Sequence, residues 1–130
     1  MAKIGKIDIS ELNNPPEKHE QATARFFAKL GKDIKFIRPL NIKGVHTPDF
    51  YMDGLAWEVK SPTARNVRSI EDNFRYATKQ SENIIFDLRR SKVPEHKSIR
   101  RIRRIAIRAR GTRRVIVVTK GKKVLTIKHK

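Results

Sequence analysis

The 130-residue sequence contains no cysteine, one tryptophan and two tyrosines. The absence of cysteine excludes a disulfide scaffold and a zinc site built from thiolates. No run of about eighteen apolar residues is present, which excludes a transmembrane helix, and the N-terminus lacks the apolar stretch of a secretory signal. Hydrophobic residues still make up 38% of the chain, so a folded domain is expected, without membrane insertion.

Acidic residues are scarce in the last third of the chain. Residues 88–130 hold 17 lysines and arginines and one acid, Glu95, whereas residues 1–87 hold 14 basic and 12 acidic residues. The formal net charge of the whole chain is +18. Such a basic surface predicts a polyanionic partner, and nucleic acid is the class expected. No linker rich in proline, glycine or serine separates the two parts, so we expect one domain over residues 14–130 after a loose N-terminal segment at residues 1–13.

Hydrophobic periodicity and turn residues predict the order of the secondary-structure elements. The expected elements are a helix over 14–30, strands over 34–40, 46–52 and 55–60, a helix over 66–81, a strand over 83–88, a helix over 98–110, and a hairpin of strands 113–119 and 122–128 around Lys120-Gly121. This order predicts an α/β (α+β) fold in which an α-β-β-β-α-β core precedes a basic helix and a β-hairpin.

The first predicted helix has clear signals at both ends. Asn14 is expected as its N-cap, Pro15 as its first helical residue and Glu17 as the acid of a capping box. Gly31 is a natural stop. The buried stripe is expected at Ala24, Phe27 and Leu30.

The dipeptide Asp53-Gly54 is typical of a two-residue β-hairpin turn. Counting outward from it pairs Met52 with Leu55 and, three residues further, Asp49 with Glu58. Side chains alternate between the two faces of a strand. One face then carries only apolar side chains, namely Phe50, Met52, Leu55, Trp57 and Val59.

The opposite face brings two carboxylates together, with the Cβ atoms of Asp49 and Glu58 about 5 Å apart. Like charges in that position destabilise a sheet, so a functional reason is expected. Two carboxylates at this distance can hold a divalent cation through oxygen ligands. Lys60 lies on the same face, where an ammonium can orient a water or neutralise charge on a phosphate. The competing interpretation is a solvated face with one Glu–Lys pair.

At these residues the chain resembles a nuclease superfamily. Pro48-Asp49, followed after eight residues by Glu58-Val59-Lys60, is similar to the motif of PD-(D/E)XK nucleases. The resemblance implies a restriction-endonuclease-like core with the order of elements predicted above. Members often carry a glutamate on the first helix, and Glu20 fits that position. Glu17 competes with it, but its expected capping role is a sufficient structural reason for that residue.

A longer resemblance runs over roughly residues 14–120, with its most similar stretches at 46–63 and 79–90. These look like the C-terminal nuclease domains of contact-dependent growth inhibition toxins and related polymorphic toxins. The resemblance implies a metal-dependent endonuclease that cleaves tRNA, with Mg²⁺ as the expected metal and Mn²⁺ or Zn²⁺ as alternatives. It also implies action in the cytoplasm of a target cell and neutralisation by an acidic immunity protein. The sequence does not decide between an excised domain and a standalone protein.

Further residues are candidates for contacts with substrate. Thr47, Ser61 and Thr63 flank the motif and can hydrogen-bond a phosphate, although each also suits the end of a strand. His46 can approach the same face, but neither it nor His19 has a partner histidine at zinc-binding spacing. Asp87 is expected in a salt bridge with neighbouring arginines. On the basic helix, the residues expected to contact phosphates are Arg100, Arg101 and Arg104.

Two other functions stay open at this stage. The first is a DNA endonuclease of the same fold, of the kind that resolves junctions or acts in phage recombination. The second is a non-catalytic basic module that binds nucleic acid, in which the carboxylates are ordinary surface residues. Cleavage of RNA through its own 2′-hydroxyl is a further alternative in which a metal matters less. The low aromatic content argues against a protein that stacks many single-stranded bases.

Overall fold

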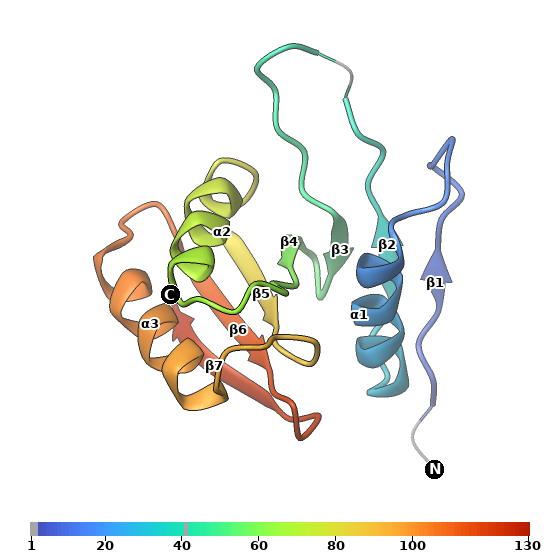
Figure 1. Ribbon diagram of the computed structural model, residues 1–130. Coiled ribbons are helices and arrows are strands. Elements are labelled where there is room, and N and C mark those ends of the chain that lie inside the picture. Colours follow the sequence, from blue (N-terminus) through green and yellow to red (C-terminus); the bar gives the residue numbers. More distant parts are fainter. Residues whose placement is uncertain (1–2, 41) are drawn as a thin grey trace. The chain divides into compact units, whose positions relative to one another are not determined.

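The computed structural model describes residues 3–40 and 42–130 (Figure 1). Residues 1–2 of the expected N-terminal segment lie outside the described residues. The chain divides into two units, Met1–Trp57 and Glu58–Lys130. The expectation of one domain over residues 14–130 stays a prediction.

The first unit combines one helix with short strands. Its elements are β1 (Ile7–Asp8), α1 (Lys18–Lys29), β2 (Ile34–Phe36), β3 (Phe50–Met52) and the first half of β4 (Leu55–Lys60). Strand β1 is parallel to β2, while β2 and β3, and then β3 and β4, are antiparallel. Helix α1 packs against β1 and β2.

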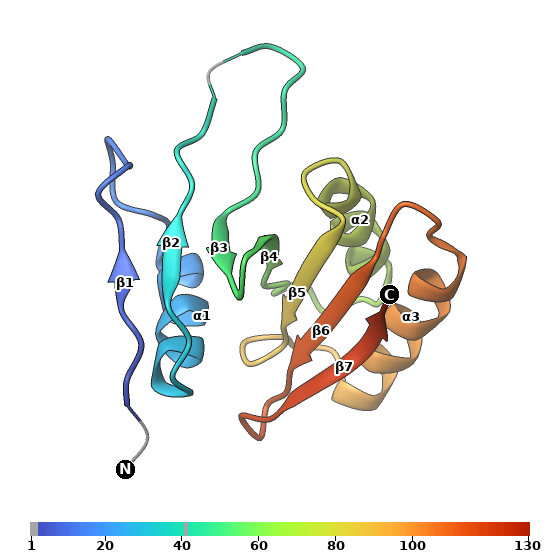
Figure 2. The same ribbon diagram turned by 180° about the vertical axis from the view of Figure 1, so that it is seen from behind.

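The second unit contains the rest of β4 together with α2 (Arg68–Thr78), β5 (Asn83–Asp87), α3 (Glu95–Arg108), β6 (Arg114–Val118) and β7 (Val124–His129). Strands β4, β5 and β6 are parallel, and β7 is antiparallel to β6. Helices α2 and α3 pack side by side on one face of these strands (Figures 1 and 2). The predicted α-β-β-β-α-β order, basic helix and final hairpin are all present, which confirms a mixed α+β fold.

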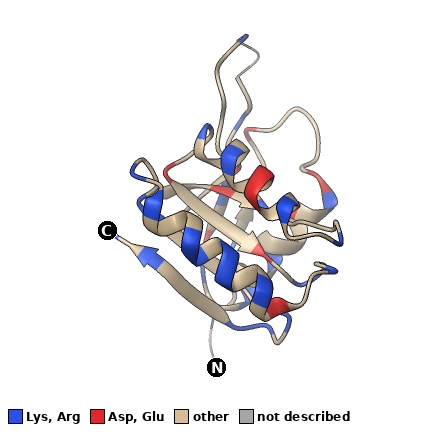
Figure 3. Ribbon diagram, turned by 60° about the vertical axis from the view of Figure 1, so that its left-hand side comes forward, with Lys and Arg blue, Asp and Glu red and all other residues tan. Residues whose placement is uncertain are grey.

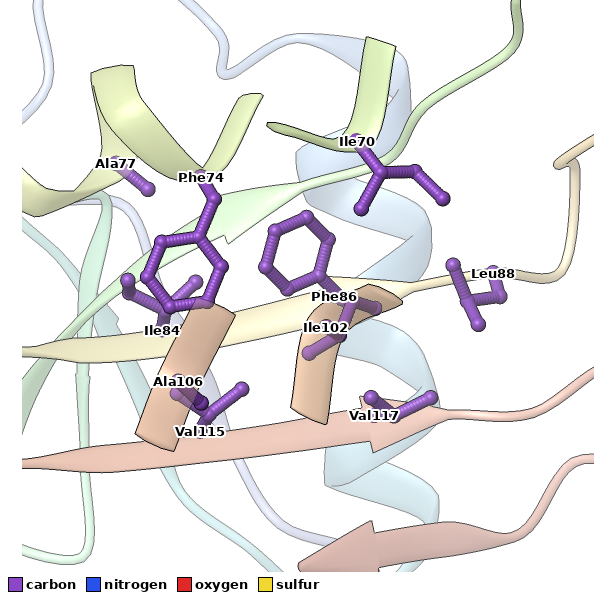
Figure 4. Close-up of a cluster of buried hydrophobic side chains, with 10 residues drawn as sticks. All are labelled: Ile70, Phe74, Ala77, Ile84, Phe86, Leu88, Ile102, Ala106, Val115 and Val117. Carbon is purple, nitrogen blue, oxygen red and sulfur yellow. The ribbon is translucent and has the colours of Figure 1, made fainter. Parts of the chain in front are cut away.

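The core of the second unit lies between that helical layer and the strands (Figure 4). Its aromatic centre is Phe74 of α2 and Phe86 of β5, whose ring centroids are 5.7 Å apart. The side chains around this pair alternate along β5 and β6, as expected for strands with one face against helices. They are Ile70, Ala77, Ile84, Leu88, Ile102, Ala106, Val115 and Val117. None of the described helices is long and apolar enough to cross a membrane.

The predicted start of the first helix is wrong. Helix α1 begins at Lys18, not near Asn14, and the Glu17 side chain makes no capping hydrogen bond. The cause is the Pro15-Pro16 pair, because a residue that precedes proline is driven out of the helical conformation. The helix ends as expected before Gly31, whose φ is +92°, but Leu30 is 53% exposed and does not extend the buried stripe.

Several other boundaries differ from the sequence-based prediction. The N-terminal segment is not wholly loose, since β1 lies within it. Strand β2 ends at Phe36, short of Pro39, and β3 begins at Phe50 rather than at residue 46. Helix α2 is shorter than 66–81, and α3 starts directly after Pro94 and ends at Arg108.

The connection between β6 and β7 in the last hairpin is longer than predicted. Val118 pairs with Val124, so the turn runs from Thr119 to Lys123 rather than over Lys120 and Gly121 alone. The residue with positive φ is Lys122, at +63°. A bulge at Val115 and Ile116 shifts the register further along the pair.

Lys128 of β7 stabilises the end of α3. Its Nζ donates hydrogen bonds of 2.8 Å and 2.9 Å to the carbonyl oxygens of Ala106 and Ala109. Helix C-termini expose carbonyls without intrahelical partners, and a cation there complements the helix dipole. Burial lowers the pKa of the Lys128 ammonium, and the charge of Lys130 lowers it further.

We expect Lys128→Met to lower the free energy of unfolding by about 1–2 kcal/mol, because the two α3 carbonyls lose their charged donor. Urea denaturation followed by circular dichroism measures this loss. Lys130→Met removes the same charge from an exposed neighbour and serves as the matched control. Equal stability of the two variants would show that the contact with α3 contributes nothing.

Candidate active site

The hairpin that carries the first half of the motif has the predicted register. Asp53 and Gly54 adopt positive φ values of +54° and +74°, as a tight two-residue turn requires. Met52 pairs with Leu55 and Phe50 with Trp57. Asp49 immediately precedes β3, and its backbone N–H donates to the Trp57 carbonyl at 2.9 Å. The hairpin therefore holds the backbone of Asp49 in place.

Asp49 and Glu20 line the same pocket of the first unit. The pocket has a volume of 310 Å³ and is walled by the segment before α1, the start of that helix, the end of β2 and the two ends of the β2–β3 connection. Thr47 also lines it, and its hydroxyl accepts a hydrogen bond of 3.2 Å from the Leu40 N–H. Three predicted site residues from two distant parts of the sequence, Glu20 in one and Thr47 with Asp49 in the other, thus line one pocket.

The start of α1 adds a cluster that the sequence argument missed. One ligand-type atom from each of Glu17, His19 and Glu20 lies within 4.8 Å of the others. His19 Nδ1 is 3.3 Å from a carboxylate oxygen of Glu17. His19 was not predicted as a ligand because it has no partner histidine at zinc-binding spacing, but two acids and one histidine close together at a helix start were an available signal. Such a mixed set of oxygen and nitrogen donors suits a divalent cation.

The second unit carries the other half of the motif. Glu58 is 2% exposed, and its carboxylate lies 3.1 Å from Lys60 Nζ. Lys60 is partly exposed and also lies 3.4 Å from the side-chain oxygen of Gln80. The prediction that Glu58 lies on an open sheet face is wrong, because the side chain is buried. Gln80, which follows shortly after the end of α2, was not predicted as a site residue.

The motif halves lie in different units, so the prediction that Asp49 and Glu58 are cross-strand neighbours stays a prediction. The pairing of β3 with β4 extends from the pair Phe50–Trp57 to the pair Met52–Leu55 beside the turn. Residues Glu58, Val59 and Lys60 pair instead with β5, in parallel. Strand β4 is the element that the two halves share.

The residues that flank the motif have varied surroundings. The Ser61 hydroxyl accepts a hydrogen bond of 2.8 Å from Arg90, whose guanidinium also donates to the Ser61 carbonyl at 3.0 Å. Arg90 was not predicted as a site residue, and its contact places a cation beside the end of β4. Thr63 and His46 are exposed.

Asp87 forms the predicted ion pair. Its carboxylate accepts hydrogen bonds from Arg89 Nε and a terminal guanidinium nitrogen, the latter at 2.7 Å. These hydrogen bonds raise the pKa of the Arg89 guanidinium, and burial opposes the shift. Asp87 is 3% exposed and its charge is compensated within β5 and the turn after it.

The predicted phosphate-contacting residues lie on the outer side of α3. Arg100 and Arg104 are exposed. Arg101 is half-buried, and its guanidinium forms an ion pair with Glu71 of α2. The three arginines line cavities at the junction of the two helices.

Comparison with known proteins gives two matches. Residues 46–124 match a family model described as the contact-dependent growth inhibition CdiA C-terminal domain. The chain is also similar to a solved structure described as the CdiA-CT/CdiI toxin and immunity complex from Burkholderia pseudomallei, with a TM-score of 0.69. Sequence identity there is 23%, over 95% of this chain and 99% of that chain, so this likeness shows the fold. No curated protein matches significantly.

We expect Lys60→Met to lower the free energy of unfolding by about 1–3 kcal/mol, because it removes the counter-charge of the buried Glu58 carboxylate. Lys60→Arg retains the charge and is expected to cost less. Lys92→Met, at an exposed lysine of the same unit, is the control for loss of a cation. If thermal denaturation shows that Lys60→Met and Lys92→Met are equally stable, Glu58 does not depend on Lys60.

Proposed function

Because this chain belongs to the family of contact-dependent growth inhibition CdiA C-terminal domains, we propose that it is a toxin domain whose activity is metal-dependent endonucleolytic cleavage of tRNA. The similar solved structure is described as a toxin with its immunity protein, which supports the toxin assignment. The residues support the nuclease assignment. Asp49, Glu58 and Lys60 match the PD-(D/E)XK motif on a fold with the corresponding order of elements.

The observation that carries the nuclease proposal is the pocket shared by Glu20 and Asp49. From the sequence alone, Glu20 was equally plausible as a surface acid. Together with Glu17 and Asp49 it gives the pocket three carboxylates from two distant parts of the chain, and Arg38 is the cation among the lining residues. Clusters of like charge are costly, so their presence favours a site that binds a cation.

Asp49 and Glu58 are the proposed metal ligands, with Glu20 as a third carboxylate. Carboxylate oxygens fit Mg²⁺ or Mn²⁺, and the imidazole of His19 next to Glu20 suits a borderline metal such as Zn²⁺. When bound, the metal lowers the pKa of a water and offsets the charge of the phosphodiester.

Lys60 has a separate role in this proposal. Glu58 and Gln80 hold its ammonium group, so it loses little freedom when a substrate binds. A fixed ammonium beside the scissile phosphate stabilises the negative charge that develops on the oxygens in the transition state. Gln80 therefore acts as a positioning residue for Lys60.

The partners follow from the same family assignment. The cationic last third suits tRNA, whose phosphates supply the complementary charge. An acidic immunity protein would protect the cell that makes the toxin, as the complex of the similar structure illustrates. The toxin would act in the cytoplasm of a target cell, where tRNA is found.

Incubation with total tRNA, and separately with plasmid DNA, tests the activity. With Mg²⁺ or Mn²⁺ we expect discrete tRNA fragments, and with EDTA none. Asp49→Asn, Glu20→Gln and Lys60→Arg are expected to slow cleavage at least about 100-fold while remaining folded by circular dichroism. Glu82→Gln, at an exposed acid outside the pocket, is the charge-matched control.

The other outcomes are equally informative. Nicked plasmid with intact tRNA would identify a DNA endonuclease of the same fold. Fragments that persist in EDTA would exclude a metal requirement. Binding of both nucleic acids without cleavage would leave a basic binding module.

Capture of the immunity protein provides a second test. With Asp49→Asn as bait in extracts of the native host, we expect one acidic protein to bind, because its charge complements the chain. Added in equimolar amount, that protein should abolish tRNA cleavage by the unmodified chain. A captured protein that leaves cleavage unchanged would contradict the assignment.

A further inference from the structure

Two cavities lie side by side where α2 packs against α3. One has a volume of 260 Å³ and is lined by Val67, Lys97, Arg100, Arg101 and Arg104. The other has a volume of 320 Å³ and is lined by Glu71, Arg104, Ile105, Arg108 and Ala109. Because Arg104 lines both, the cavities are neighbours, and we call the two together the α2–α3 groove.

The groove is strongly cationic. Its single acid is Glu71, and the Glu71 carboxylate pairs with Arg101. Within residues 3–40 and 42–130, no ion pair is made by the four other cations, which are Lys97, Arg100, Arg104 and Arg108. All four side chains are exposed, so their charge is available to a ligand.

The spacing of these cations forms a row. Positions 97, 100, 101, 104 and 108 fall on one side of a helix with 3.6 residues per turn. From Lys97 to Arg108 the row extends about 16 Å at about 1.5 Å per residue. Figure 3 shows basic residues at successive turns along α3. Each nucleotide of a strand carries one phosphate, and even in B-form DNA these recur about every 3.4 Å along the axis, so a row of this length can follow several phosphates of an RNA strand.

The other exposed flank of α3 has a different character. Ile107, at 82% exposure, interrupts the basic residues there. Arg103 is the cation of the helix that lies on this flank and lines neither cavity. The uninterrupted row of cations on α3 therefore lies on the side that lines the groove.

We propose that the α2–α3 groove binds the sugar-phosphate backbone of the RNA substrate. This inference rests on the proposed function for the identity of the nucleic acid. No aromatic side chain is among the residues that line either cavity, so the groove offers no platform for stacked bases. The N-terminus of α2 begins after Val67, and its partial positive charge adds to that of the arginines.

A polynucleotide fits the groove better than a protein partner does. Protein interfaces are anchored by aromatic and apolar side chains at their centre. The apolar residues of the groove are Val67, Ile105 and Ala109, which are small or half-buried. Affinity from such a row comes from the release of counterions and does not depend on base sequence.

The test compares two triple variants of equal charge in the full chain, each combined with Lys60→Ala so that RNA stays intact. The groove variant carries Lys97→Gln, Arg100→Gln and Arg104→Gln. The control carries Arg103→Gln, Arg110→Gln and Arg113→Gln, at exposed positions that line neither cavity. Arg101 is left unchanged because it pairs with Glu71. Binding of fluorescently labelled total tRNA is followed by anisotropy from about 50 to about 200 mM salt, a range over which affinity from phosphate contacts changes strongly.

We expect the groove variant to bind tRNA at least about tenfold more weakly than Lys60→Ala alone. The negative slope of log K against log salt should become shallower by about 2–3, because three phosphate contacts are lost. The control should change both quantities much less. Equal effects in the two triple variants would overturn the proposal, since general charge would then suffice. The single variants Arg100→Gln and Arg104→Gln repeat the comparison if a triple variant does not fold.

Two further results separate this inference from the proposed function. Loss of tRNA binding in the groove variant, with no cleavage by the unmodified chain, would support the groove and contradict the nuclease assignment. If the groove variant binds tRNA as the control does but no longer binds the immunity protein, the surface belongs to the protein partner and the inference is wrong.

Discussion

The register of the hairpin formed by β3 and β4 is the constraint on which the candidate site depends. The turn at Asp53 and Gly54 pairs Phe50 with Trp57, and side chains alternate between faces from there. A slip of one residue would exchange the two faces and move Asp49 to the apolar side. The indole nitrogen of Trp57 donates to the Met52 carbonyl at 3.0 Å, which stabilises the same register.

Burial of charge is the second feature that organises the molecule. Glu58 is almost wholly buried, and such a carboxylate is costly even when it is paired, so the pair with Lys60 is weak evidence for stability. Under the proposed function, the pair would instead prepare a site in which a fixed lysine meets a phosphate. Asp87 illustrates the other case, since its charge is compensated locally by Arg89.

The cationic last third folds because its charge is separated from its apolar side chains. Helix α3 buries Ser98, Ile102 and Ala106, and all its arginines except the half-buried Arg101 are exposed. Repulsion among these arginines is reduced by solvent and by Glu71. The same segregation leaves one flank of the helix as a row of cations beside α2. The packing of α3 against the core and the proposed affinity of its outer side for RNA therefore depend on the same segregation of side chains.

Local patterns in the sequence determined the order of elements, the Asp53-Gly54 turn and the apolar face of the hairpin, because turn chemistry and alternation act over a few residues. They failed where two local rules competed. Asn14 and Glu17 predict a helix start near Asn14, but the pair Pro15-Pro16 delays the helix to Lys18. Only the tertiary structure decided that Glu20 shares a pocket with Asp49, that Glu58 is buried and that Gln80 contacts Lys60. These contacts join residues far apart in the chain, and their geometry depends on how helices and strands pack, which no local pattern encodes.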